Sequence, residues 1–83
     1  MYYVYILQSQ STGKYYVGYT ADIRARLAQH NSQSNPSRST RHRGPWYIVY
    51  SERLPGRAAA YARERQIKSY KGGNGFKKLL GLL

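Results

Sequence analysis

The stretch YYVGYTADIRARLAQHN, residues 15–31, predicts a β-strand that runs directly into an α-helix. Residues 15–19 are mostly aromatic or β-branched, and such residues favour strands. Thr20 can cap the following helix, because a threonine hydroxyl accepts a hydrogen bond from an early backbone N–H. Asp22 places a negative charge at the positive end of the helix dipole. This junction of strand and helix decides the fold class.

The helix is expected over residues 21–30, with a narrow apolar stripe made by Ile23 and Leu27. Arg26 and His30 lie beside that stripe, next to the buried edge. Each also has a plain structural interpretation. The arginine can be a solvated residue whose stem covers part of the core, and the histidine can complement the negative end of the helix dipole.

Upstream, a second strand and a turn complete a β-hairpin. Residues 2–8, YYVYILQ, have the aromatic and β-branched composition of a strand. Residues 9–14, SQSTGK, have turn chemistry, and Gly13 can adopt a positive φ. The first segment of the chain is therefore predicted to be a hairpin of two strands.

Downstream, the sequence predicts a loop, a third strand and two more helices. Residues 31–44 are polar and form a long loop, a type that is often functional in a compact domain. Residues 45–51, PWYIVYS, alternate as a strand does, and Leu54-Pro55-Gly56 ends it. The alanine-rich residues 58–70 favour a helix, and residues 76–83 predict a last short one.

The resulting order, β-β-α-β-α-α, predicts a small α/β (α+β) fold in which helices gather on a sheet. With 83 residues and no internal repeat, the chain is expected to form a single domain over residues 1–83.

The charge balance predicts an anionic partner. Lys and Arg number 14 against 3 Asp and Glu, a formal net charge of +11, and 10 tyrosines add stacking faces. Nucleic acid fits this composition better than a membrane surface, since no basic amphipathic helix with a bulky apolar face is prominent. The chain has no Cys, no leader-like start and only a short apolar cluster at residues 79–83, so we expect a cytoplasmic protein.

Only three carboxylates are present, and they differ in their surroundings. Asp22 is explained as the charge at a helix start, and Glu52 is expected to be solvated at a strand end. Glu64 flanks the apolar stripe of the helix predicted over residues 58–70. Its plain interpretation is an exposed pair with Lys68, four positions along the same helix.

Three residues of the hairpin also have plain interpretations. Tyr5 and Tyr16, taken singly, would be sheet residues with their hydroxyls at the rim. Gly18 weakens a strand unless something must approach the backbone closely there.

Together, these segments resemble the GIY-YIG nuclease superfamily. Tyr3-Val4-Tyr5 and Tyr16-Val17-Gly18 match its paired signature, with the two motif tyrosines eleven positions apart. Residues 20–31 resemble the next family block, in which an arginine precedes a leucine and a His-Asn pair follows. Pro45-Trp46 and residues 62–68, ARERQIK, resemble later blocks of the short single-domain branch. The likeness covers nearly the whole chain in the right order.

The resemblance implies a phosphodiesterase fold with a central three-stranded antiparallel sheet flanked by helices. It also implies six site residues: the motif tyrosines Tyr5 and Tyr16, the motif glycine Gly18, the catalytic arginine Arg26, the additional site residue His30, and the metal ligand Glu64. Position 3 is tyrosine where the family name has glycine. Many family nucleases have an asparagine after the glutamate, and Asn74 is the only candidate for it.

Counting the acids predicts a one-metal mechanism. Two-metal nucleases need several carboxylates, and at most one of the three in this chain is well placed. One Mg²⁺ or Mn²⁺ on Glu64 would fit, because phosphate oxygens and waters can complete its coordination. Arg26 would bind the scissile phosphate and stabilise its developing charge. No small-molecule cofactor is expected.

One of the two motif tyrosines would take or relay the proton of the attacking water. The pKa of a free phenol is near 10, so a phenolate would need neighbouring cations, for which Lys14, Arg24, Arg26 and the metal are candidates. Either tyrosine can fill this role. His30 could orient one of them or protonate the leaving group.

We therefore expect a divalent-metal-dependent endonuclease that hydrolyses phosphodiester bonds in DNA, with single-stranded DNA, branched DNA and RNA all left open as substrates. The alternative is a non-catalytic nucleic-acid-binding module on the same fold. The loop over residues 31–44 is expected to face the substrate. The residues expected to contact nucleic acid are Lys14, Gly18, Arg24, Arg38, Arg41, Arg43 and Lys68. The oligomeric state is left open.

Overall fold

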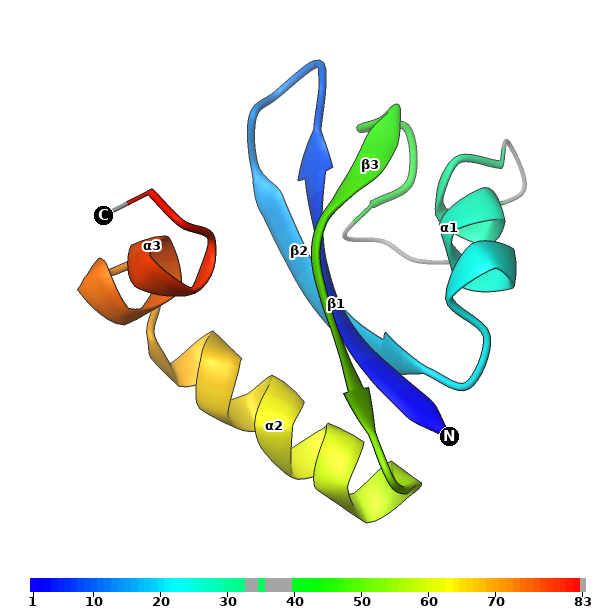
Figure 1. Ribbon diagram of the computed structural model, residues 1–83. Helices are drawn as coiled ribbons and strands as arrows, with labels where there is room; N and C mark the ends of the chain where they lie inside the picture. Colours follow the sequence, from blue (N-terminus) through cyan, green and yellow to red (C-terminus); the bar gives the residue numbers. More distant parts are fainter. Residues whose placement is uncertain (33–34, 36–39, 83) are drawn as a thin grey trace.

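A three-stranded antiparallel sheet with the strand order β2-β1-β3 forms the centre of the protein (Figure 1). The computed structural model describes residues 1–32, 35 and 40–82. Strand β1 (Tyr2–Ser9) lies between β2 (Tyr15–Thr20) and β3 (Trp46–Leu54). The sheet confirms the predicted hairpin and third strand, although the third strand continues to Leu54 instead of ending at residue 51.

Helices cover both faces of this sheet. Helix α1 (Ile23–His30) lies on one face, and α2 (Arg57–Ser69) and α3 (Asn74–Leu79) lie on the other (Figure 1). The observed order, β-β-α-β-α-α, and the α+β class agree with the predictions. Both faces of β1 are therefore buried.

The alternation of side chains along β1 divides the core into two clusters. One cluster, on the side of α2 and α3, consists of Val4, Ile6, Ala60, Ile67 and Phe76. The other, on the side of α1, consists of Tyr5, Leu7 and Trp46. Tyr5 is only 2% exposed, so its ring is part of the core, unlike that of a tyrosine whose hydroxyl lies at the rim.

The cap of α1 differs from the prediction. The helix begins at Ile23, and its capping residue is Asp22, whose Oδ1 accepts a hydrogen bond from the Ala25 backbone N–H at 3.1 Å. Thr20, the predicted cap, is the last residue of β2, and its hydroxyl accepts from the Asp22 backbone N–H instead. An aspartate is as good a cap as a threonine, so the strand extends by one residue and the helix starts later.

The last helix also differs from the prediction of residues 76–83. It runs from Asn74 to Leu79, and Gly81 follows in the left-handed conformation with φ 75°. Such a glycine commonly ends a helix. Phe76 is buried and Leu79 and Leu80 pack on the core cluster, as their shared face predicts. Residue 83 lies outside the described part of the chain.

Glu52 is bonded instead of solvated. Its carboxylate lies 3.1 Å from Nε of Arg63 and accepts a hydrogen bond from the hydroxyl of Tyr50 at 2.6 Å. The prediction of a solvated strand-end carboxylate was wrong, because α2 packs across β3 and brings a guanidinium to it. Glu52 is therefore paired with a residue of α2 and makes no contact with α1 through this bond.

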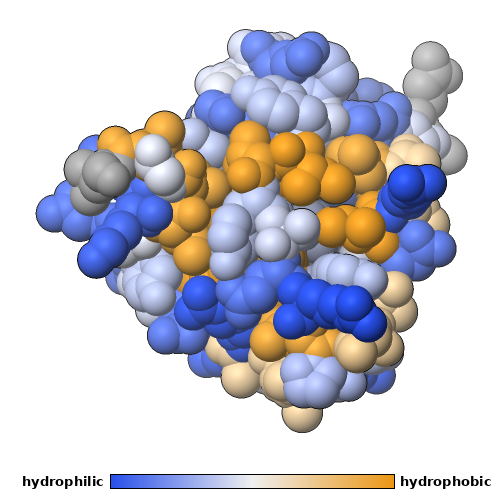
Figure 2. All heavy atoms as spheres, viewed as in Figure 1, coloured by the Kyte–Doolittle hydropathy of each residue, from blue (hydrophilic) through white to orange (hydrophobic). Residues whose placement is uncertain are grey.

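Figure 2 shows one face of the molecule, on which hydrophilic side chains gather over α2 and hydrophobic ones over β3 and α3. Ile48 of β3 belongs to the exposed apolar residues. Within residues 1–32, 35 and 40–82, none of the helices combines the length and the apolar character that crossing a membrane requires.

Candidate active site

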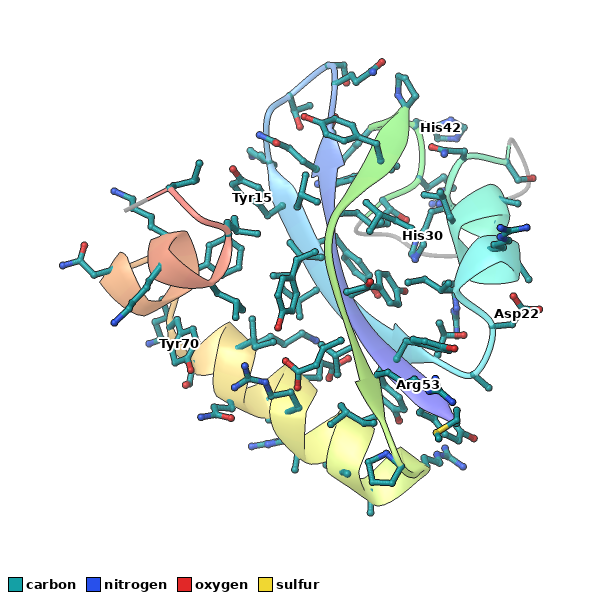
Figure 3. The ribbon with its side chains drawn as sticks, viewed as in Figure 1. Tyr15, Asp22, His30, His42, Arg53 and Tyr70 are labelled. Atoms are coloured by element: carbon teal, nitrogen blue, oxygen red, sulfur yellow. The ribbon has the colours of Figure 1, made fainter. Side chains whose placement is uncertain are left out.

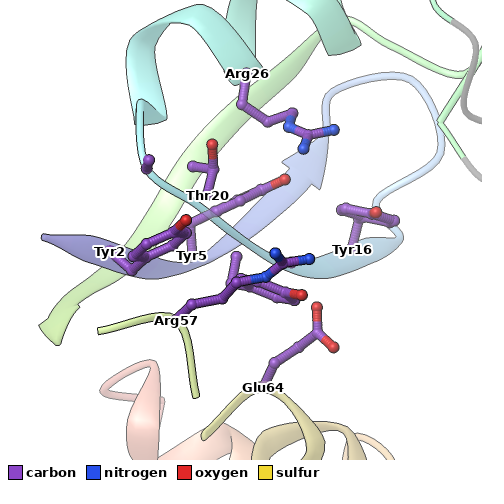
Figure 4. A pocket seen from close by; sticks show the side chains of 10 residues that line it. Tyr2, Tyr5, Tyr16, Thr20, Arg26, Arg57 and Glu64 are labelled. Atoms are coloured by element: carbon purple, nitrogen blue, oxygen red, sulfur yellow. The ribbon is translucent and has the colours of Figure 1, made fainter. Parts of the chain in front are cut away.

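One cavity gathers most of the residues for which a catalytic role was predicted. It has a volume of about 430 Å³ and lies where β1 and β2 meet α1 and α2 (Figure 4). We call it the first cavity, and the residues that matter most in its lining are Tyr5, Tyr16, Gly18, Arg26, Arg57 and Glu64. Its volume is within the range of ligand-binding sites. Phenols, guanidiniums and one carboxylate therefore face the same space.

Gly18 makes room for Tyr5 in this cavity. The two residues lie opposite one another in the register of β1 and β2. A Cβ atom on Gly18 would lie 2.6 Å from Tyr5 Oη and 3.1 Å from Cε2 of Tyr16. The phenol of Tyr5 therefore crosses β2 at the position without a side chain. The close approach expected at a strand glycine is made here by another side chain of the same sheet.

A chain of hydrogen bonds leads from Tyr5 into the protein. Tyr5 Oη lies 3.0 Å from His30 Nε2, and His30 Nδ1 lies 2.7 Å from Thr40 Oγ1. Asn35 Nδ2 donates to the same Thr40 oxygen at 2.7 Å. His30, the last residue of α1, thus lies behind Tyr5 and in contact with Thr40, and it does not line the first cavity (Figure 3).

Sequence reasoning did not single out Thr40 and Asn35. Both are buried, at 0% and 2% exposure, although they belong to a polar stretch whose composition predicts a loop. Trp46 supplies the reason, because its indole Nε1 donates to the Thr40 carbonyl at 2.9 Å and draws that backbone against the core. No signal in the sequence distinguishes these two residues from their exposed neighbours.

Burial controls the protonation of Tyr5. Desolvation raises its pKa well above the ordinary value of 10, the neighbouring Tyr16 raises it further, and the positive charge of Arg26 opposes the shift. Arg26 thus acts on Tyr5 in the expected direction, but in the protein without a bound metal desolvation outweighs it. Near neutral pH its hydroxyl keeps its proton.

The same burial keeps His30 neutral. Desolvation lowers its pKa from the ordinary value of 6.5, and the positive charge of Arg26 lowers it further. A neutral imidazole has one donor nitrogen and one acceptor nitrogen. His30 can therefore accept a proton from Tyr5 on one side while it donates to Thr40 on the other.

Two arginines reach the first cavity from different helices, Arg26 from α1 and Arg57 from α2 (Figure 4). The hydroxyl of Tyr19, by hydrogen bonding and by charge, and Tyr2 raise the pKa of Arg57. Sequence reasoning missed this residue, which belongs to no motif. The one available signal is its place at the first position of a helix, where a cation opposes the helix dipole.

Glu64 approaches the cavity from α2 and forms the predicted pair with Lys68, although its own side chain is not exposed. Its side chain is 12% exposed, and its Oε1 lies 3.5 Å from Nζ of Lys68, whose side chain is 53% exposed. The carboxylate is thus paired along its helix and also lines the first cavity.

The donor set of the first cavity fits a single divalent cation. Glu64 is the only carboxylate in its lining, and the described residues contain no group of three or more His, Cys, Asp or Glu that could hold an ion. Mg²⁺ is commonly held by one or two carboxylates together with waters and substrate phosphates. The exposed head group of Lys68 can move away from the carboxylate oxygen to admit the ion.

The other predicted site residues lie elsewhere. Four are exposed and do not line the first cavity: Lys14, Arg24, Arg41 and Arg43. Arg38 lies outside the described residues. Lys68 lines a neighbouring cavity, and Asn74 is an exposed residue at the start of α3.

Comparison with known proteins agrees with this fold. The family model of the GIY-YIG catalytic domain matches residues 1–77. The solution NMR structure of a UPF0213 protein from Bacillus halodurans matches with a TM-score of 0.60 and 31% identity, covering 99% of this chain and 85% of that one. The fold described above is therefore shared with a solved structure.

Two relatives have similar sequences. A UPF0213 protein of Haloquadratum walsbyi is 41% identical over 82% of this chain and 74% of its own length. A UPF0213 protein of Halobacterium salinarum is 37% identical over 82% of this chain and 86% of its own length. Neither name states an activity. The family match covers nearly all of the chain, and this protein therefore belongs to the GIY-YIG family, whose catalytic domain indicates a nuclease-type function.

Proposed function

We propose that this protein is a divalent-metal-dependent endonuclease that hydrolyses phosphodiester bonds in DNA, with RNA as a second candidate substrate. One observation carries the proposal: two tyrosines, two arginines and one carboxylate from four different elements line one cavity. A phosphodiester needs charge neutralisation, a proton acceptor for water and support for the leaving oxygen; these side chains match the first two needs, and a metal on Glu64 would meet the third.

The arginines bind the scissile phosphate. A guanidinium offers several N–H donors in a planar fork and keeps its charge at all relevant pH values. Arg26 and Arg57 enter the cavity from different helices, so the phosphate can be held between them. The hydrogen bonds that they donate become stronger as negative charge accumulates on the phosphate oxygens in the transition state.

Tyr5 and His30 move the proton of the attacking water. Because Tyr5 is protonated, it accepts this proton only as it passes its own to His30 Nε2, 3.0 Å away. That transfer requires the tautomer in which Nδ1 carries the hydrogen and donates to Thr40 Oγ1. The same oxygen accepts from Asn35, so both of its lone pairs are used. Tyr16, whose ring centroid lies 6.4 Å from that of Tyr5 and 4.9 Å from that of His30, orients the water.

Glu64 is the residue that would hold the metal, with waters and phosphate oxygens completing the coordination. When bound, the metal supplies Lewis-acid stabilisation of the phosphate charge. Tyr5, His30 and the arginines contribute the steps described above.

The test is nicking of plasmid and single-stranded DNA with Mg²⁺ or Mn²⁺. Glu64→Gln and Arg26→Ala should each reduce the rate by ~100-fold or more, since each removes a charge that stabilises the transition state. The matched controls are Glu52→Gln, an acid paired with Arg63, and Arg53→Ala, an exposed arginine of β3. Both controls should cut like the wild type. Robust cutting by the Glu64 and Arg26 variants would dispose of the proposal.

A second candidate, a nucleic-acid-binding module without activity, is favoured by the small donor set around Glu64 among the described residues. It predicts binding that weakens steeply with salt and no product with any divalent ion. The same preparations used for nicking distinguish the two functions.

A further inference from the structure

A second cavity adjoins the first. It has a volume of about 430 Å³ and lies between β2 and the end of α2 with α3, where its lining includes Tyr15, Tyr16, Ile67, Lys68, Lys71 and Phe76. Tyr16 lines both cavities. Lys68 lines the second and is paired with Glu64 of the first. A nucleic-acid strand bound in the first cavity can therefore continue into the second.

The second cavity has an aromatic wall that is held in place yet accessible. Tyr15 is 40% exposed and projects from β2 toward α3 (Figure 3). Its ring lies 5.2 Å from that of Phe76 at an angle of 71°, and Phe76 is only 6% exposed. The buried phenylalanine thus fixes the tyrosine in an edge-on contact and leaves much of the phenol open to a partner.

The charge of the second cavity is positive. Lys68 and Lys71 both line it, and none of the described residues in its lining is acidic. Lys71 has φ 51°, a left-handed conformation that residues other than glycine rarely adopt. An aromatic wall beside two ammonium groups is the combination that binds a base and its phosphate.

We propose that the second cavity binds an unpaired nucleotide that flanks the scissile phosphate, with its base against Tyr15 and its phosphate at Lys68 and Lys71. The inference rests on the proposed function and narrows its substrate to nucleic acid that is single-stranded beside the cut. A base within a duplex is stacked on both faces and offers none to Tyr15, whereas an unpaired base stacks readily on an aromatic side chain.

The experiment measures binding without divalent ions, by fluorescence anisotropy with three labelled probes: a thymidine oligonucleotide, an abasic strand of the same length, and a duplex. Tyr15→Leu should weaken binding to the base-containing strand by ~10-fold and leave the other two probes unchanged, since it removes only stacking. Tyr15→Phe keeps the ring and should bind like the wild type. Lys71→Gln should weaken binding to both single strands by ~3-fold, through one lost phosphate contact.

Matched controls separate the cavity from general effects. Tyr47→Leu changes an equally exposed tyrosine on β3, at 40%, and Lys78→Gln removes a charge from α3 outside the cavity. Both should bind like the wild type. The inference is overturned if Tyr15→Leu and Lys71→Gln lose no more affinity than these controls, and Lys71→Gln remains decisive if Tyr15→Leu unfolds.

Parallel nicking assays separate this inference from the proposed function. If the wild type cuts DNA but binding affinity does not depend on Tyr15 or Lys71, the proposed activity stands and the nucleotide site is rejected. If the wild type cuts nothing, yet Tyr15→Leu shows the base-dependent loss of affinity, the nucleotide site stands and the proposed activity is rejected.

Discussion

At the scale of single residues, Gly18 controls the geometry of the proposed site. Its missing side chain leaves the space that the Tyr5 hydroxyl occupies, 2.6 Å from where a Cβ would lie. Gly18→Ala should force the phenol away from His30, cost about 1–3 kcal/mol of unfolding free energy by overpacking, and reduce nicking by ~100-fold. Urea unfolding and initial nicking rates measure the two effects.

The control for this prediction is Gly56→Ala, at a glycine whose added Cβ would meet nothing within 4 Å. It should retain activity. A double variant with Tyr5→Phe adds a second check, because removal of Oη removes the nearest clash and should recover part of the lost stability. Stability losses that simply add would contradict the contact between Gly18 and Tyr5.

His30 makes stability depend on pH. Desolvation, and then the charge of Arg26, lower its pKa from 6.5, so the unfolded chain binds a proton at higher pH than the folded protein does. The stabilisation is fully present above 6.5 and is lost as the pH falls through the lower folded pKa. Urea unfolding between about pH 5 and 8 should show this decline.

The chain has one other histidine, which provides the control. His42 is exposed, so His42→Gln should keep the decline in stability toward acid pH. His30→Gln should lower the overall stability and flatten the curve in this window. An unchanged slope in His30→Gln would mean that the buried imidazole is not the group that titrates.

At the scale of elements, the first turn of α2 carries a charge that the helix itself disfavours. Arg57 is the first residue of α2, where the positive end of the dipole repels a cation. Its side chain lines the first cavity, so we expect it to bind the substrate phosphate and not to stabilise the helix. Arg57→Gln should reduce nicking by ~10-fold while leaving the melting temperature unchanged or slightly higher.

The comparison for Arg57 is Arg65→Gln, an arginine of the same helix that bonds to the Tyr61 hydroxyl away from the first cavity. That variant should cut like the wild type. If Arg57→Gln lowers stability and leaves nicking intact, the residue supports the fold and has no role in the proposed site.

Local patterns predicted which elements form but not where each begins. The alternation along β1 and the apolar stripe of α1 are properties of neighbouring residues, so they can be read from the sequence. The cap of α1 depends on a competition between Thr20 and Asp22, both good capping residues, and local pattern does not decide it. The start of α3 at Asn74 was missed for a similar reason, because two glycines precede it and either could end the previous helix.

The candidate site was predictable where a motif exists and unpredictable where burial decides. The motif spacing singled out Tyr5, Arg26 and Glu64, and all three line one cavity. The protonated state of Tyr5 depends on how α1 and Trp46 enclose it, which is a tertiary property. The buried partner Thr40 is likewise set by packing, and no local pattern reports it.

At the scale of the whole molecule, the charge is almost entirely uncompensated. The formal net charge is +11, and each of the three acids has a local role. Asp22 caps α1, Glu52 pairs with Arg63, and Glu64 lines the first cavity. The remaining cations are therefore available to a polyanion, so affinity for nucleic acid should fall steeply as salt rises.

Substitutions in the segment between α1 and β3 can show whether its arginines bind phosphates directly or only add to the long-range electrostatic attraction of the whole molecule. Arg41 and Arg43 are exposed there, and Arg38 lies in the same segment outside the described residues. Replacing all three with Ala should lower the slope of log affinity against log salt by about 2–3 units, if each arginine contacts a phosphate.

A control that replaces Arg53, Arg65 and Lys77 removes the same charge from β3, α2 and α3. It should change the slope far less, because counterion release follows contacts and not net charge. Equal slopes for the two triple variants would remove the segment from the binding surface.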